Sequence, residues 1–357
     1  MRSRKVIYAV IGVLVFALVF FCLQRLLMPK YTREAQEGRL IAEYYGSDKI
    51  HDVVFIGDCE VYENISPVTL WEKYGISSYV RGSPQQLIWH SYYLLEDTLR
   101  YETPKIVVFN VLSMKYGEPQ SEAYNRLALD GMRLSSVKIS AIKASMTEDE
   151  SLISYIFPLL RFHSRWNELN PDDFKYMFTS PAQLSVGGYL MRVDAKPAKT
   201  LHPGQALGDY SFADICWEYL EKMRTLCEEK GISLVLMKAP SLLPYWYDEW
   251  DEQIVKYASE HDIPYYNFLN MAEQTGIDYS TDTYDEGQHL NVWGAEKLSA
   301  QFGKYLTELG APDRRNDAEY EKSWRSLCER YDAIKQYQLD ILKETGSITG
   351  FPVPDDK

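Results

Sequence analysis

Short apolar runs alternate with longer amphipathic segments between residues 51 and 309. The apolar runs are predicted strands: 51–57, 76–82, 105–111, 232–240 and 263–268. Helical periodicity predicts helices at 85–101, 212–230, 248–261 and 291–309, with a further helix beginning at Ser66. The runs are apolar at successive positions, as in strands that are buried on both faces of a parallel sheet. We therefore predict a three-layer αβα sandwich with about five parallel strands, a flavodoxin-like arrangement.

An apolar stretch of eighteen residues, Val6–Leu23, lies near the N-terminus. As a helix it is ~27 Å long, close to the thickness of a bilayer core. Basic residues precede it, which predicts a cytoplasmic N-terminus and an extracellular C-terminal domain. A cleaved signal peptide has a shorter apolar stretch and a small-residue cleavage site, and a lipoprotein has small residues before its cysteine, whereas two phenylalanines precede Cys22. We expect an uncleaved, single-pass transmembrane anchor in the cell membrane.

Five segments are predicted along the chain. They are a cytoplasmic tail (1–5), the anchor (6–28), a stalk (29–49), a main domain (50–310), and a C-terminal amphipathic helix and tail (311–357). Residues 118–210 show no β pattern and contain helical pieces at 134–146, 150–165 and 171–178. We predict that they form an insertion over one end of the sheet, where ligands of α/β domains bind. The C-terminal helix either packs on its own domain or offers a surface to a partner.

Composition and charge exclude several classes of protein. The chain has 51 acidic and 38 basic residues and a net charge of −13, which argues against binding to nucleic acid. Its 46% hydrophobic content argues against general disorder. The five cysteines include no CxxC pair, and HExxH, P-loop and GxGxxG motifs are absent from the sequence. We expect no metal and no cofactor.

Candidate chemistry lies in four short segments, three after predicted strands and one before the last helix: 57–60, 81–83, 109–111 and 284–295. Parallel topology should bring them to one edge of the sheet. Cys59 follows the first strand at a helix start, which favours a thiolate nucleophile. His289 is the natural base, and Asp285 or Glu286 would orient its ring, with Asp285 preferred.

The same segments offer an oxyanion hole. The backbone N–H groups of Cys59 and Gly82 and the side chain of Asn110 are the predicted donors. Gly82 lacks a Cβ atom, which would let the backbone approach a substrate closely. Asp58 and Glu60 flank Cys59, and their negative charge should raise the pKa of the thiol and weaken its activation.

The order GD-C, Gly, Asn and D-x-x-x-H-L-N resembles the SGNH/GDSL hydrolase superfamily, with Cys59 in place of the nucleophilic serine. The resemblance covers 51–309 without the insertion. The flanking segments VYENISPVTLW, SPQQLIWHSYYLL and HLNVWGAEKLS are similar to membrane-anchored, cell-envelope members of bacterial type. Those are related to the D-alanyl transfer protein of lipoteichoic acid and to alginate or peptidoglycan O-acetyltransferases.

This resemblance implies an SGNH fold and an esterase or O-acyltransferase acting through an acyl-cysteine. It also implies a cell-envelope glycan or acylated polymer as substrate, and a multi-span membrane acyltransferase as a partner. The sequence leaves hydrolysis and transfer open. It also leaves open a catalytically inactive, glycan-binding or scaffolding protein on the same fold. Five further residues are candidate substrate contacts, with ordinary packing or ion pairing as the alternative: Glu286, His163, Arg165, Lys238 and Trp246.

Overall fold

The computed structural model describes residues 2–29, 36–180, 182–198 and 204–354. It contains a parallel five-stranded sheet of order β2-β1-β3-β4-β5. The strands are β1 (Val53–Gly57), β2 (Ser78–Gly82), β3 (Ile106–Asn110), β4 (Ser233–Lys238) and β5 (Tyr265–Asn267). In register, Gly57 pairs with Gly82, and Asn110 pairs with Met237. The predicted strands and the α/β fold class are confirmed, and the carboxyl ends of the strands meet at one edge.

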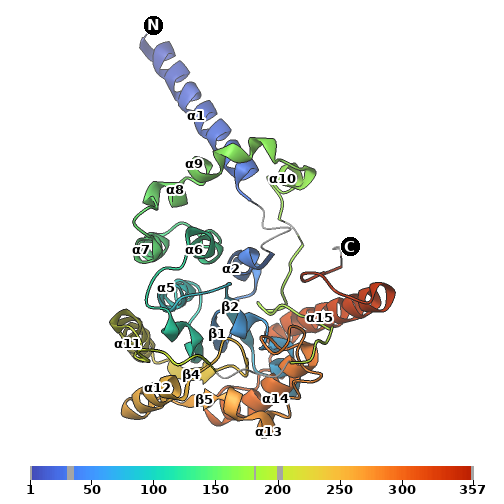
Figure 1. The fold of residues 1–357 in the computed structure, drawn as a ribbon. Coiled ribbons are helices and arrows are strands. Elements are labelled where there is room, and N and C mark those ends of the chain that lie inside the picture. The colour runs from blue at the N-terminus through green and yellow to red at the C-terminus, as the bar shows by residue number, and fades with distance from the viewer. Residues whose placement is uncertain (1, 30–35, 181, 199–203, 355–357) are drawn as a thin grey trace.

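Helices cover both faces of the sheet, as Figure 1 shows. One face packs against α4 (Pro67–Tyr74), α14 (Val292–Glu308) and α15 (Ala318–Thr345). The other packs against α5 (Ile88–Thr98), α11 (Asp214–Glu229) and α12 (Asp248–Glu260). Side chains along β1 alternate between the two cores: Phe55 lies in the first, and Val54 and Ile56 lie in the second. The sequences of the strands are continuously apolar because both faces of the sheet are buried.

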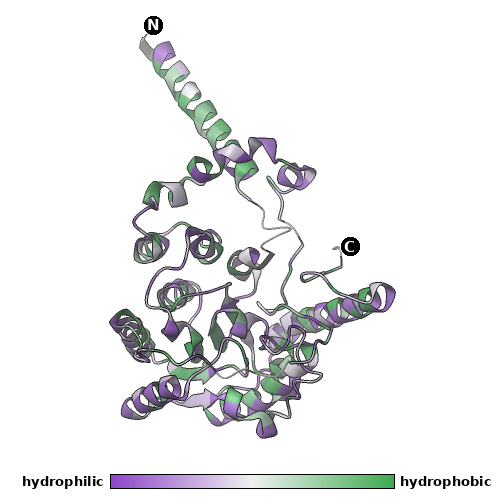
Figure 2. Ribbon diagram, viewed as in Figure 1, coloured by the Kyte–Doolittle hydropathy of each residue, from purple (hydrophilic) through white to green (hydrophobic). Residues whose placement is uncertain are grey.

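An exposed helix, α1 (Arg2–Leu27), projects from the domain. Its segment Arg4–Leu27 has a mean hydropathy of 3.0, and the most apolar part of it is not buried, so it is long and apolar enough to cross a membrane. Figure 2 shows that it is largely hydrophobic along its length. The stalk continues as three short helical pieces: η1 (Gln36–Arg39), α2 (Leu40–Glu43) and η2 (Tyr44–Gly46). Met1 of the predicted tail and residues 30–35 of the predicted stalk lie outside the described residues.

The insertion contains more helices than the sequence predicts. They are α6 (Glu122–Leu129), α7 (Ser136–Ser145), α8 (Leu152–Ile156), α9 (Leu159–Phe162), η4 (His163–Asn167) and α10 (Pro171–Lys175). The single helix predicted at 150–165 divides at Pro158, because proline has no N–H to continue the hydrogen-bond ladder. Helix α6 was missed; the Ser121 side chain caps its first turn.

The helical part of the insertion extends from α5 toward α1. Helix α7 packs on α5, and α9 and α10 contact α1. The later stretch 184–198 instead runs beside the loop that precedes α14: Val292 N–H donates to the Arg192 carbonyl, and Glu286 N–H donates to that of Lys196. This stretch reaches the edge that carries the candidate site. Residues 181 and 199–203 of the insertion lie outside the described residues.

Helix α15 packs back on α4. The rings of Trp71 and Trp324 stack with their centroids 5.1 Å apart. Gln338 interrupts the apolar spacing of this helix, yet it is buried, because its amide donates to the carbonyls of Met191 and Pro352. Residues 355–357 of the predicted tail are not described. The remaining short elements are α3 (Cys59–Tyr62), η3 (Val111–Lys115), η5 (Phe268–Asn270) and α13 (Ala272–Thr275).

Candidate active site

Helix α3 and the loop 283–291 are held together by hydrogen bonds, although they are far apart in sequence. The Leu290 N–H donates to Asn64 Oδ1 over 2.8 Å, and the Asn64 amide donates to Ser241 Oγ over 3.1 Å. The Tyr284 hydroxyl donates to the Glu63 carboxylate. Asn64 is completely buried, so these bonds form in a dry environment where they are costly to break. They fix the loop against the C-terminal end of α3.

These hydrogen bonds bring Cys59, His289 and Asp285 together. The His289 Nδ1 lies 2.6 Å from Asp285 Oδ2, and the His289 backbone N–H donates to Asp285 Oδ1 over 2.8 Å. The Cys59 thiol lies near the His289 ring: the imidazole lowers the pKa of the thiol, and the thiol raises the pKa of the imidazole. Because Asp285 occupies Nδ1, the nitrogen left for the thiol is Nε2. All three residues are partly exposed, so a ligand can reach them.

A second carboxylate, Glu63, lies close to His289 and was missed in the sequence. Its Oε2 is 3.7 Å from the His289 Nδ1, and its side chain is only 5% exposed. The Glu63 N–H donates to the Cys59 carbonyl, so the two residues are one helical turn apart. The sequence does carry a signal for it: Glu63 is four positions after Cys59, and residues four apart lie on the same face of a helix.

These neighbours set the charges in the site. Burial would lower the pKa of His289, but Glu63, Cys59 and the hydrogen bond from Asp285 raise it well above its usual value. Burial raises the pKa of the Cys59 thiol to about 12; His289 opposes this shift, and Asp58 and Glu63 add to it. In the resting state, therefore, a neutral thiol faces a protonated imidazole.

A buried polar network lies behind Cys59. Lys238 Nζ donates to both oxygens of Glu60, at 2.8 and 3.1 Å. The Asn110 amide nitrogen donates to Glu60 Oε2 at 3.0 Å and to Asp58 Oδ1 at 3.3 Å. Asp58 also caps α3 by accepting from the Glu60 N–H. Burial, together with the nearby Glu60, raises the pKa of Asp58 to about 7.

One predicted oxyanion donor, the side chain of Asn110, is engaged within the protein, and the reason for glycine at position 82 differs from the expected one. The Asn110 amide nitrogen lies within bonding distance of two carboxylates, and its Oδ1 accepts from the Ala239 N–H. Gly82 is buried, and a Cβ atom there would lie 2.9 Å from the Tyr62 ring and 3.0 Å from the Gly57 carbonyl. Glycine is therefore required by packing between β2 and α3, and the close approach is to this chain rather than to a substrate.

The five candidate substrate contacts are placed elsewhere. Glu286 pairs with Lys196 at 2.9 Å, which leaves Asp285 as the carboxylate on the histidine. Lys238 is completely buried in its pair with Glu60, and Trp246 is a core side chain that donates to Asp251. His163 and Arg165 lie in η4 at the foot of α1, where Arg165 donates to the Leu27 carbonyl. Burial or pairing thus occupies the polar groups of Glu286, Lys238, Trp246 and Arg165, whereas the His163 ring is exposed with Nδ1 3.0 Å from the Leu160 carbonyl.

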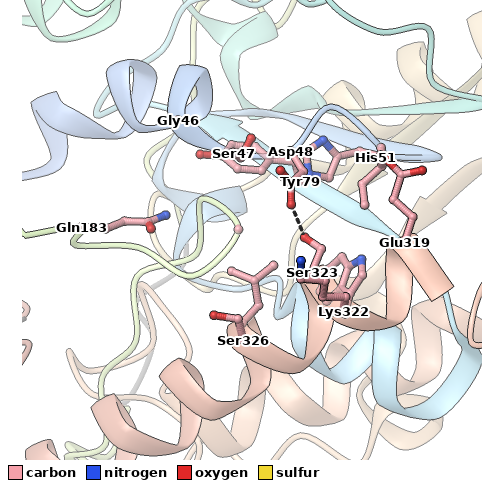
Figure 3. Close-up of a pocket in the computed structure, with 14 residues that line it drawn as sticks. Gly46, Ser47, Asp48, His51, Tyr79, Gln183, Glu319, Lys322, Ser323 and Ser326 are labelled. Carbon is pink, nitrogen blue, oxygen red and sulfur yellow. Dashed lines mark hydrogen bonds between the residues drawn. The ribbon is translucent and has the colours of Figure 1, made fainter.

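Neither of the two cavities described next contains Cys59 or His289. The cavity in Figure 3 has a volume of about 480 Å³ and lies between the stalk and α15, where Ser323 donates to Asp48 over 2.6 Å. It includes Tyr79 near the start of β2, so it is at the opposite edge of the sheet from Cys59. A cavity of about 700 Å³ lies at the foot of α1. Among the described residues, no group of three or more potential metal ligands occurs.

Comparison with known proteins gives little to add to this geometry. No protein-family model matches the chain, and no curated protein matches its sequence. One similar solved structure is a candidate acylhydrolase from Bacteroides fragilis, with 12% identity, 78% of this chain and 95% of that chain covered, and a TM-score of 0.36. Another is a GDSL-like lipase from Bacteroides thetaiotaomicron, which is 11% identical. The match covers 76% of this chain and 97% of that chain, with a TM-score of 0.36. At these identities and TM-scores, function has to be argued from the site.

Proposed function

We propose that this protein is a membrane-anchored enzyme that moves an acyl group through a covalent acyl-cysteine. The observation that carries the proposal is the grouping of Cys59, His289 and Asp285, with the imidazole hydrogen-bonded to Asp285 and close enough to Cys59 to lower the pKa of its thiol. A thiol, an imidazole and an orienting carboxylate are the parts of a nucleophile with its base. The proposed setting is the outer face of a bacterial cell membrane, with α1 as the anchor and the N-terminus in the cytoplasm.

Each half of the reaction uses the same three residues. The resting imidazolium first loses one proton to solvent; the Cys59 proton then passes to the free His289 Nε2, and the sulfur attacks the carbonyl carbon of the acyl donor. The bond from that carbon to the leaving oxygen breaks, and the oxygen takes the proton from His289. An acceptor hydroxyl then gives its proton to His289 and attacks the thioester, which frees Cys59. Asp285 keeps the ring oriented throughout through its bond to Nδ1.

The acceptor decides between hydrolysis, with water, and transfer, with a hydroxyl of a cell-envelope glycan or polymer. We propose such a glycan as the substrate and a multi-span membrane acyltransferase as the donor-side partner, on the strength of the sequence resemblance. For the oxyanion we retain the Cys59 and Gly82 backbone N–H groups. Asn110 has no role in this step, because its amide is donated to Asp58 and Glu60.

A mass measurement tests the covalent step. The full chain in detergent micelles is incubated with an activated acetyl ester, digested, and examined for an acetyl group on the peptide that contains Cys59. We expect an adduct that is absent in Cys59→Ala and strongly reduced in His289→Ala. Cys328, a second partly exposed cysteine, serves as the internal control for non-specific acetylation. An adduct at Cys59 that forms equally fast in His289→Ala would contradict the proposed base.

One observation favours a second candidate function. The raised pKa of Cys59 keeps the resting thiol neutral, and the raised pKa of His289 keeps the imidazole protonated and unable to take the thiol proton, as expected of a site that does not react. The alternative is a catalytically inactive protein that binds or scaffolds envelope glycan. It predicts no Cys59 adduct at any pH and glycan binding that survives the Cys59→Ala/His289→Ala double substitution.

A further inference from the structure

Residues 152–178 of the insertion form the foot of α1, and we call them the anchor-foot segment. Figure 1 shows α8, α9 and α10 around the end of α1 that joins the domain. The rings of Phe20 and Phe157 meet edge to face with centroids 5.7 Å apart. Arg165 Nη1 donates to the Leu27 carbonyl over 2.7 Å. The segment is therefore fixed to the last two turns of the proposed membrane span.

The anchor-foot segment exposes large apolar side chains that a protein surface in water normally buries. Five of its residues are more than half exposed: Ile153, Leu160, Trp166, Phe174 and Phe178. Elsewhere after α1, in the ranges that the structure describes, only Leu134 and Val255 among large apolar residues reach one half. A concentration of exposed aromatic and aliphatic side chains marks a surface that contacts another apolar phase.

The charge of the anchor-foot segment differs from that of the rest of the chain. Its three basic residues match its three acidic ones, so its net charge is zero, whereas the whole chain carries −13. These residues are Arg161, Arg165, Lys175, Glu168, Asp172 and Asp173. An acidic surface is repelled by anionic lipid head groups, and this neutral segment is not.

The distances along α1 place the segment at the membrane boundary. Phe20 and Leu27, which contact it, are seven residues apart, or ~10 Å along the helix. The interfacial layer on each side of a bilayer is on the order of 5–8 Å thick. Tryptophan and tyrosine are enriched at this depth, and tryptophan, phenylalanine and leucine form the inserted face of helices that lie in the interface.

We propose that the anchor-foot segment is seated in the outer interfacial layer of the bilayer, with Trp166, Phe174 and Phe178 inserted among the lipids. The inference rests on the membrane anchor proposed above. Seated in this way, the segment would hold the catalytic domain at a set height and tilt, because α7 connects it to α5 and the sheet. A single helix alone leaves the domain free to swing about its stalk.

Quenching of tryptophan fluorescence tests the proposal. The full chain is reconstituted into phosphatidylcholine vesicles whose acyl chains carry bromine close to the head group, and its emission is compared with that in unbrominated vesicles. The chain has eight tryptophans, so the contribution of one is obtained as a difference between variants. Trp166→Phe should lose the quenched component. Trp293→Phe, an exposed tryptophan on α14, is the matched control and should keep it.

The outcomes separate this inference from the anchor itself. Flotation with the vesicles and quenching that depends on Trp166 support the proposal. Flotation without such quenching overturns it and leaves the anchor intact; the exposed face would then meet a protein or a second copy of the chain. A chain that does not float with vesicles overturns the anchor and, with it, the seated segment.

Discussion

The edge of the sheet at Cys59 and the anchor-foot segment both differ from ordinary protein regions, one in its buried charges and the other in its exposed apolar side chains. The first buries charges: Glu60, Lys238 and Asp58 are almost inaccessible to solvent. The second exposes apolar side chains such as Trp166 and Phe174. Burying a charge and exposing a large apolar group both cost free energy, so each departure points to a use. We propose a chemical site as the use of the first and a lipid surface as the use of the second.

The largest expected effect is a loss of stability at the buried charges near Cys59. Lys238→Met leaves Glu60 without its cation in a dry environment, and we expect it to lower the free energy of unfolding by about 3–5 kcal/mol. Urea denaturation of the chain in detergent micelles measures the change. The control is Lys256→Met, since Lys256 is exposed and 3.9 Å from Glu260, and its loss should cost less than about 0.5 kcal/mol.

The double variant Lys238→Met/Glu60→Gln sharpens the result. It removes both charges while the glutamine oxygen can still accept from Asn110, so it should recover part of the stability that Lys238→Met loses. Equal losses in Lys238→Met and Lys256→Met would mean that Glu60 is not held as a buried carboxylate.

An intermediate effect is expected from Glu63→Gln. Glu63 raises the pKa of both His289 and Cys59, and its removal should lower both values. The reactive form of the pair has one proton fewer than the resting form, so acylation of Cys59 should speed up as pH rises. In Glu63→Gln the rise should begin at a pH lower by about one unit or more.

The rate of Cys59 acylation by an activated ester, followed from near-neutral to alkaline pH, measures this shift. Glu286→Gln is the matched control, because Glu286 pairs with Lys196 rather than with the histidine. If the pH profile of Glu63→Gln stays in place or moves to higher pH, Glu63 does not raise the pKa values of His289 and Cys59.

The smallest effect is expected in the anchor-foot segment. Phe174→Ala should change the free energy of unfolding in micelles by less than about 0.5 kcal/mol, because its ring is mostly exposed. Phe302→Ala, which empties a fully buried position against Phe55 and Phe268, should cost about 3–5 kcal/mol. A cost above about 2 kcal/mol for Phe174→Ala would show that its ring packs on protein and would exclude it from the lipid-facing surface.

Prediction from sequence worked where the signal is local. The five strands were found because continuous apolar runs report burial on both faces, and the final helix was found because Asn291 caps it and its apolar residues recur at helical spacing. Prediction failed where a side chain could choose between partners. Lys238, Trp246 and Arg165 are plausible substrate contacts by type, but Glu60, the core and the Leu27 carbonyl occupy them.

The sequence by itself determined the parallel α/β fold, the long apolar N-terminal helix and the residue types at the ends of the strands, because periodicity and residue type act over a few positions. Only the tertiary structure decided that Asp285 rather than Glu286 reaches His289, that Glu63 lies beside it, and that Asn110 faces carboxylates. The positions of Asp285 and Glu63 beside the histidine depend on hydrogen bonds by which Glu63 and Asn64 fix a loop more than two hundred residues away. Hydrogen bonds between segments so distant leave no local pattern.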